Sequence, residues 1–216
     1  MTTEERRGAL KEALIAAGIQ TIETRGLRAL RARDLAKAVG CSLGSIYIVF
    51  PDLDTLILSI NLSTMALMEA HLAGVVKPLP PDHSPKARDA AREQLVALSL
   101  SYLEFAAANL LRWRAIFEHR LELLEHPPEV RQAAPDWYTE EIGKLFAFIE
   151  TPVRVMRPDL DAEESALLAR SLFSAAHGMV ALGLEDKITT VPIAHLADQL
   201  RIVVNAMARG LMVDNG

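Results

Sequence analysis

Cysteine is almost absent from this 216-residue chain: Cys41 stands alone, so no disulfide can form within one molecule. A chain without disulfides fits the reducing cytoplasm. No uninterrupted apolar run reaches the roughly 18 residues that a membrane span needs. The N-terminal MTTEERRGALKEAL mixes charged with apolar residues and lacks the apolar core of a signal peptide. We therefore predict a cytoplasmic protein that does not associate with a membrane.

Motifs typical of enzymes are also missing. The sequence has no phosphate-binding glycine loop, no nucleophile elbow and no paired cysteines. Glu118, His119 and Glu122 are the nearest approach to a metal site, but neighbouring residues on a helix point in different directions, and no second ligand cluster accompanies them. We predict no catalytic residues, no metal and no cofactor.

The alternation of apolar and polar residues that marks β-strands is nearly absent. Long stretches rich in Ala, Leu, Glu and Arg dominate instead, which predicts an all-α fold of about nine helices. We expect these helices at about residues 5–26, 32–39, 43–49, 53–76, 86–107, 109–125, 136–156, 161–185 and 191–211. Ile15, Ile19 and Ile22 recur at helical spacing and define the expected apolar face of the first helix.

Short polar residues and glycines punctuate the first four helices. Gly40 directly follows the second helix, where a left-handed turn residue would sit. Ser42 is a candidate N-cap of the third helix, and Asp52 of the fourth. A short helix, a turn containing Gly and a second short helix make a helix-turn-helix over about residues 31–50.

Charge is distributed unevenly around this motif. Residues 25–37 contain five basic residues and one acidic residue, a local charge of +4, whereas the whole chain has a net charge of −5. A basic patch on an acidic body is typical of a nucleic-acid-binding module attached to another domain. A solvated helix face would also account for it.

The segment RARDLAKAVGCSLGSIYIVFPDLDTL, residues 31–56, resembles the N-terminal DNA-binding domain of TetR-type transcriptional repressors. The match extends over about residues 8–68, with the following in register: Gly26, Leu35, Ala36, Val39, Gly40, Ser42, Gly44, Ile46, Tyr47, Phe50 and Leu56. The resemblance implies a DNA-binding domain at 1–52 and a helical ligand-binding and dimerisation domain at 53–216.

In that family, the start of the second helix, the hydroxyls of the third helix and the start of the fourth helix contact phosphates, and the third helix reads bases. The resemblance thus implies that the DNA-binding residues are Arg28, Arg31, Arg33, Lys37, Ser42, Leu43, Gly44, Ser45, Tyr47 and Ile48. Three residues depart from the pattern. Arg31 replaces the usual Ser or Thr cap of the second helix, Val49 a frequent His, and Leu53 a frequent Lys.

The segments RWRAIFEHRLE, PDWY and RSLFSAAHGMVALGLEDK resemble the subgroup of TetR-type regulators named for a Trp…His-Gly motif, with Phe173 in the Trp position before His177-Gly178. The resemblance implies a ligand cavity, for which the candidates are Tyr102, Phe105, Trp113, Phe117, Trp137, Phe146, Phe173 and His177. Each aromatic would also fit a hydrophobic core. The partner that His177 needs inside an apolar helix is a ligand, a carbonyl or a carboxylate.

The family also implies homodimerisation through the last two long helices. Both carry broad apolar stripes, and the candidate interface residues are Leu168, Leu172, Ala175, Met179, Leu196, Leu200, Val203 and Met207. The same stripes would fit a core within one chain.

The resemblance therefore implies a ligand-responsive transcriptional regulator, usually a repressor in this family. As a homodimer it would bind a palindromic operator in double-stranded DNA and release it when a largely apolar small molecule occupies the C-terminal pocket. The alternative is a TetR-fold protein that binds a small molecule but has weakened or lost DNA binding, suggested by Leu43, Val49 and Leu53.

Overall fold

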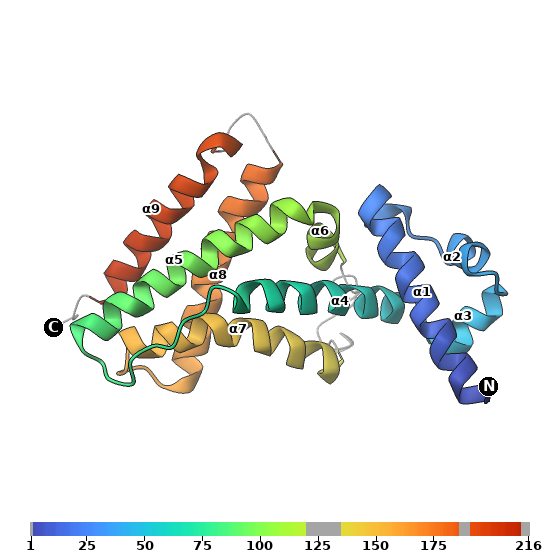
Figure 1. Ribbon diagram of the computed structural model, residues 1–216, viewed down its shortest axis with the longest axis horizontal. Helices are drawn as coiled ribbons and strands as arrows, with labels where there is room; N and C mark the ends of the chain where they lie inside the picture. The colour runs from blue at the N-terminus through green and yellow to red at the C-terminus, as the bar shows by residue number, and fades with distance from the viewer. Residues whose placement is uncertain (1, 120–134, 186–190, 213–216) are drawn as a thin grey trace, which may run out of the picture. The chain divides into compact units, whose positions relative to one another are not determined.

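Every regular element that the computed structural model describes is a helix (Figure 1); the described residues are 2–119, 135–185 and 191–212. The elements are α1 (Thr3–Arg25), a 3-10 helix η1 (Leu27–Ala29), α2 (Ala32–Val39), α3 (Leu43–Val49), α4 (Leu53–Ala73), α5 (Pro85–Ala108), α6 (Leu110–Glu118), α7 (Asp136–Met156), α8 (Ala162–Leu184) and α9 (Ile193–Leu211). The predicted all-α fold of about nine helices is confirmed for this part of the chain.

Local sequence signals account for most helix ends. Gly40 ends α2 in the left-handed conformation, with φ 75° and ψ 35°. The Ser42 hydroxyl accepts a hydrogen bond from the Ser45 amide at 3.1 Å, and the Asp52 carboxylate accepts one from the Thr55 amide at 2.6 Å. These bonds confirm the predicted caps of α3 and α4.

Two ends differ from the prediction. Ala73 is the last residue of α4, three residues before the predicted end. Glu118 is the last residue of α6, because His119 adopts an extended conformation with ψ 97°. Residues 120–125 of the predicted sixth helix lie outside the described residues.

Two compact units share the chain. Unit 1 comprises residues 1–67 and 109–141, and unit 2 comprises residues 68–108 and 142–216, so that α4 and α7 contribute to both. These compact units do not test the predicted boundary between a DNA-binding domain at 1–52 and a ligand-binding and dimerisation domain at 53–216, which stays a prediction.

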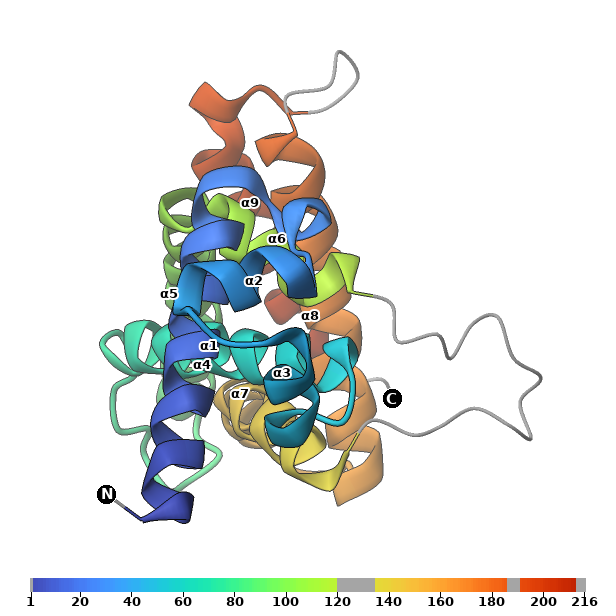
Figure 2. The ribbon, with the colours of Figure 1, turned by 90° about the vertical axis from the view of Figure 1, so that its right-hand side faces the viewer.

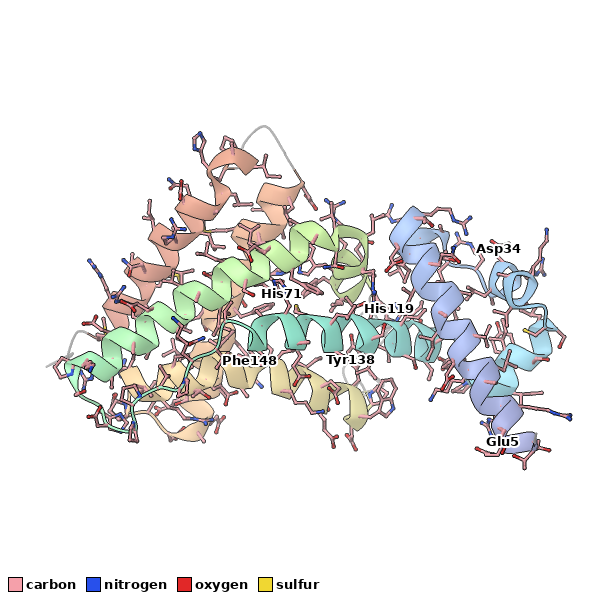
Figure 3. All side chains as sticks on the ribbon, viewed as in Figure 1. Glu5, Asp34, His71, His119, Tyr138 and Phe148 are labelled. Carbon is pink, nitrogen blue, oxygen red and sulfur yellow. The ribbon has the colours of Figure 1, made fainter. Side chains whose placement is uncertain are left out.

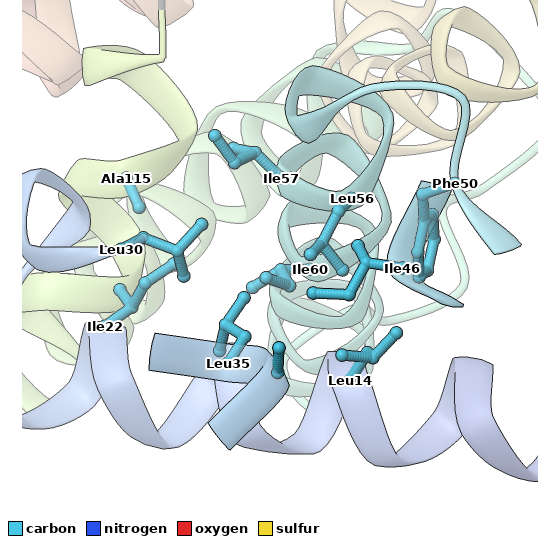
Figure 4. Packing of buried hydrophobic residues seen from close by; sticks show 11 residues of the cluster. Leu14, Ile22, Leu30, Leu35, Ile46, Phe50, Leu56, Ile57, Ile60 and Ala115 are labelled. Carbon is cyan, nitrogen blue, oxygen red and sulfur yellow. The ribbon is translucent and has the colours of Figure 1, made fainter. Parts of the chain in front are cut away.

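The core of unit 1 joins the first helices of the chain to α6 (Figure 4). It contains Leu14, Ile22, Leu30, Leu35, Ala36, Ile46, Phe50, Leu56, Ile57, Ile60 and Ala115. Gly18 lies on the same face of α1, where an added Cβ would be 2.3 Å from the Ile60 side chain of α4. Ile15 and Ile19 are only partly buried, so the buried face of α1 is centred one residue before the predicted one.

In unit 2, α5 packs against α8 and α9, which also pack against each other (Figures 1 and 2). A Cβ added at Gly183 of α8 would lie 2.6 Å from Leu196 of α9, so these two helices approach closely at this point. Leu196 and Leu200 are completely buried in this packing.

By length and composition alone, α4 and α8 could cross a membrane, and a third span results if α5 and α6 together count as one. The sequence has no uninterrupted apolar run of about 18 residues and therefore predicted no membrane span. These helices nevertheless have a high mean hydropathy, because the residues that interrupt their apolar stretches include Ser, Thr and Asn, which are uncharged. Of the most apolar 18 residues in each helix, half are buried in α4 but only 17% in α8. The apolar surface of α8 is therefore only partly covered in a single chain.

Candidate nucleic-acid interface and ligand-binding region

The helix-turn-helix of unit 1 consists of α2, the turn 40–42 and α3, which lie beside α1 (Figure 2). Ile46 and Phe50, both 1% exposed, hold α3 against the core. Other side chains of α3 are open to solvent: Leu43 is 37% exposed, Tyr47 49% and Ile48, on the side opposite the core, 68%. The hydrogen-bonding side chains of α3 are few. The Ser45 hydroxyl is 2.8 Å from the Ser42 hydroxyl, so these two groups already pair with each other.

The predicted basic contacts, Arg28, Arg31, Arg33 and Lys37, are all exposed on η1, on α2 and at the N-cap of α2. Arg31 makes no capping bond to α2, as expected from the loss of the usual hydroxyl. Its Nη1 instead donates to the carbonyl oxygens of Arg28 at 2.7 Å and Leu30 at 2.9 Å. The guanidinium thereby satisfies carbonyls at the end of η1 and remains at the surface.

A buried arginine in unit 1 has no counterpart among the sequence predictions. Arg112 of α6 is 7% exposed. Its Nη1 donates to a Glu23 carboxylate oxygen on α1 at 3.1 Å, its Nη2 to the Ser63 hydroxyl at 3.0 Å and its Nε to the Thr64 hydroxyl at 3.2 Å. One side chain therefore links α6 to α1 and α4. Only the long-range contacts reveal this role, because an isolated Arg in an amphipathic helix predicts an exposed residue.

A second polar contact joins the end of α6 to the start of α4. The His119 side chain (Figure 3) is 7% exposed. Its Nε2 lies 3.5 Å from an Asp54 carboxylate oxygen. Burial lowers the pKa of His119 and outweighs the opposing effect of Asp54 and Asp52. The third residue of the metal cluster weighed from the sequence, Glu122, lies outside the described residues. Within the described ranges, no three His, Cys, Asp or Glu side chains are placed to hold a metal ion.

Four predicted pocket residues form one aromatic cluster in unit 2. The centroid of the Phe173 ring lies 5.6 Å from that of Tyr102, 5.4 Å from that of Phe146 and 5.4 Å from that of His177. The His177 imidazole stacks on the Phe173 ring with an angle of 28° between the two planes. The Tyr102 hydroxyl is 2.8 Å from His177 Nδ1. A phenol on α5 is thus a partner of His177, which differs from each of the three partners considered from the sequence.

The other four predicted pocket residues lie elsewhere. Phe105 is buried near His71 in unit 2, with ring centroids 5.8 Å apart. In unit 1, the ring centroids of buried Trp113 and exposed Phe117 are 5.5 Å apart. Those of exposed Trp137 and Tyr138 are 5.9 Å apart. Whether any of the eight binds a ligand stays a prediction.

Unit 2 also contains a cavity of about 740 Å³ that none of the eight predicted residues lines. Its walls come from the end of α4, residues 76–79, α5 and α7, and include Val76, Lys77, Leu79, Gln94, Lys144 and Phe148. Buried Gln94 holds the wall in place, because its amide accepts from the Lys77 amide at 2.9 Å and donates to the Val75 carbonyl at 3.3 Å. The sequence did not predict this cavity because its walls meet only when the segment after α4 packs against α5 and α7.

The buried imidazoles give a pH-dependent stability. Burial lowers the pKa of His177 and of His119 below 6.5, so the folded state resists protonation more than the unfolded state does. We expect the free energy of unfolding to be highest above about pH 6.5 and to fall as the pH drops below it. Urea unfolding of wild type and His177→Gln between about pH 7.5 and 5.5 measures this. The variant should show a flatter profile, and exposed His195→Gln should match wild type; equal slopes in all three would contradict the expectation.

The predicted interface residues divide by exposure. In α8, Leu168, Leu172, Ala175 and Met179 are half-buried, as are Val203 and Met207 in α9, whereas Leu196 and Leu200 lie in the interior of unit 2. The large apolar side chains that α8 and α9 expose are Leu167, Leu182, Ile193 and Ile202. Their role in an interface between chains stays a prediction.

These features define a class: an all-helical protein with a helix-turn-helix in one unit and packed helices with a cavity in the other. The family model described as "Tetracyclin repressor-like, C-terminal domain" matches residues 95–207. This is more than half of the chain, and the protein belongs to the tetracycline repressor-like (TetR) family of transcriptional regulators. Its assignment to the Trp…His-Gly subgroup stays a prediction.

Several solved structures share the fold. A TetR transcriptional regulator from Rhodococcus sp. RHA1 aligns with a TM-score of 0.57 at 12% identity, covering 99% of this chain and 100% of that chain. The TetR-family regulator PfmR from Thermus thermophilus has a TM-score of 0.53 at 14% identity and covers 92% and 96%. RolR in complex with resorcinol has a TM-score of 0.62 at 13% identity and covers 97% and 96%. No curated protein matches the chain significantly.

Proposed function

We propose that the protein is a cytoplasmic, ligand-responsive transcriptional repressor that binds a palindromic operator as a homodimer. The observation that carries this proposal is the helix-turn-helix of unit 1, in which α3 exposes Leu43, Tyr47 and Ile48 and the residues from η1 through α2 expose Arg28, Arg33 and Lys37. An α-helix fits the major groove of B-DNA. The basic side chains and the Tyr47 hydroxyl bind phosphates, which positions α3 on the duplex.

The exposed apolar side chains of α8 and α9 support homodimerisation. Leu167, Ser171, Ser174, Gly178 and Leu182 recur along one side of α8 at spacings of three and four residues, which places them on one face. Such a face of apolar and small residues allows a second copy to pack closely. Two recognition helices about 34–36 Å apart then meet the two half-sites of a palindrome.

Substitution of Leu167 by Glu is expected to convert the dimer into a monomer, because burying a carboxylate in an apolar interface is unfavourable. Sedimentation velocity at micromolar concentration measures the change in mass. Leu67→Glu is the control, since Leu67 is also exposed but lies in unit 1 and should leave the dimer intact. A Leu167→Glu protein that sediments as wild type would exclude this interface.

The effector that we propose is a largely apolar small molecule bound in the cavity of unit 2. The volume of about 740 Å³ lies in the range of known ligand pockets, about 300–1,000 Å³. RolR, which shares the fold, binds resorcinol. The effector acts by binding more tightly to the form with low operator affinity. A compound found by thermal-shift screening should release DNA from wild type and from Phe117→Ala, but not from Phe148→Ala, which removes a cavity wall.

Selection from a random duplex library with the purified full-length protein tests DNA binding. We expect enrichment of palindromes with half-sites about one helical turn apart. The Arg33→Ala, Lys37→Ala double variant should bind the enriched duplex more weakly and with a smaller dependence on salt, because fewer counterions are released. If no sequence is enriched while compounds still stabilise the protein, the alternative of a small-molecule-binding TetR-fold protein without DNA binding is favoured. The apolar α3 face is the observation that supports that alternative.

A further inference from the structure

The recognition helix α3 exposes two large aliphatic side chains, Ile48 and Leu43, that do not belong to the core of unit 1; we call this exposed apolar surface the ridge. Ile48, at 68%, has the largest exposed fraction among the large hydrophobic side chains in the described ranges, and Leu43 lies on the same short helix at 37%. Ile46 and Phe50 already anchor α3 from the opposite face. The ridge therefore presents apolar surface to the outside of unit 1.

The side chains of α3 lack the groups that usually read bases by hydrogen bonding. Arg or Lys recognises guanine, Asn or Gln recognises adenine, and Asp or Glu recognises cytosine. The sequence of α3, LGSIYIV, contains none of these residues. The Ser45 hydroxyl is paired with Ser42, as described above. In the major groove, the base-edge group that an apolar side chain recognises is the C5 methyl group of thymine.

Charge identifies DNA, rather than a protein, as the occupant of this ridge. The chain as a whole is acidic, with a net charge of −5, but residues 25–37, which include most of α2, carry a local charge of +4, and their Arg28, Arg31, Arg33 and Lys37 are exposed. A helix-turn-helix that combines exposed apolar side chains on α3 with these cations complements a groove in which thymine methyls lie between two phosphate backbones. If the ridge bound a protein instead, no duplex would be enriched in the experiment described below.

We propose that α3 selects its half-site through thymine C5 methyl groups, with Ile48 and Leu43 as the specificity-determining residues. This inference rests on the proposed function as a DNA-binding regulator. It has a chemical consequence: the protein recognises the methyl group rather than the base pair. Uracil, which pairs as thymine does but lacks the methyl, is bound less well, whereas 5-methylcytosine presents the same methyl and substitutes for thymine.

The experiment uses the full-length dimer and the duplex enriched from the random library. Thymines of the half-sites are replaced by uracil one position at a time, symmetrically in both halves, and affinity is measured by fluorescence anisotropy. Burial of one methyl corresponds to about a fourfold change in affinity, so a symmetric pair should cost about 15-fold at the contacted position. Changing that thymine to cytosine should weaken binding similarly, and 5-methylcytosine should restore it.

Protein variants assign the effect to the ridge. Ile48→Ala should bind the thymine and uracil duplexes with nearly equal affinity, because the side chain that contacts the methyl is gone. Leu67→Ala, which shortens an exposed side chain of α4 in unit 1, should keep the full preference for thymine.

The outcomes separate the two proposals. Equal affinity of wild type for thymine and uracil at every position overturns the methyl readout and leaves DNA binding established. A loss in Ile48→Ala that is equal for both duplexes also overturns it. If no duplex is enriched at all, the proposed function fails and the methyl readout fails with it.

Discussion

Replacing Phe50 with Ala is expected to lower the free energy of unfolding of unit 1 by about 3–5 kcal/mol, the usual cost of removing a buried aromatic ring. Phe50 is 1% exposed and packs in the cluster that joins α3 to α1 and α4 (Figure 4). Pro51 follows immediately, so the chain turns into α4 directly after this anchor. The neighbouring groups cannot fill the cavity without moving α3 away from its position.

The matched control is Ile48→Ala, two residues earlier on the same helix. Because Ile48 is largely exposed, its truncation should change stability by no more than about 0.5 kcal/mol. Urea unfolding followed by circular dichroism distinguishes the two variants. If Ile48→Ala destabilised the protein as strongly as Phe50→Ala, the ridge would belong to the core, and the assignment of the two faces of α3 would be wrong.

The second large effect concerns the ion pair of Arg112. Replacing Glu23 with Ala leaves the guanidinium buried without its carboxylate, and we expect a loss of about 1–3 kcal/mol. This is less than the cost of breaking a fully buried pair, because the Glu23 side chain is 48% exposed and water can approach the site.

Removal of the arginine itself should be better tolerated. In Arg112→Met, the Ser63 and Thr64 hydroxyls still donate to the Ile60 carbonyl, at 2.7 and 3.4 Å, and Glu23 turns to solvent. The double variant Glu23→Ala, Arg112→Met should therefore be more stable than Glu23→Ala alone. A double-mutant cycle from urea unfolding measures this coupling. Strictly additive effects would show that the ion pair does not link α1 to α6 energetically.

The sequence by itself determined the helices of this protein and most of their ends. Gly40, Ser42 and Asp52 act on backbone groups within a few residues, so their roles could be predicted without knowledge of the rest of the fold. The two faces of α3 were also predictable, because residues four apart lie on one side of a helix. The pattern of residues 31–56 indicated the TetR family, and the match of the family model over residues 95–207 confirmed it.

Only the tertiary structure decided which neighbours each helix face meets. Ile15, Ile19 and Ile22 predicted the buried face of α1, but α4 approaches so closely at Gly18 that the face is centred on Leu14 and Gly18 instead. The partner of His177, the ion pair of Arg112 and the cavity beside Gln94 are likewise formed by residues distant in sequence. Caps and periodicity act over one or two turns, whereas these features depend on the distance and rotation between packed helices, which local sequence does not specify.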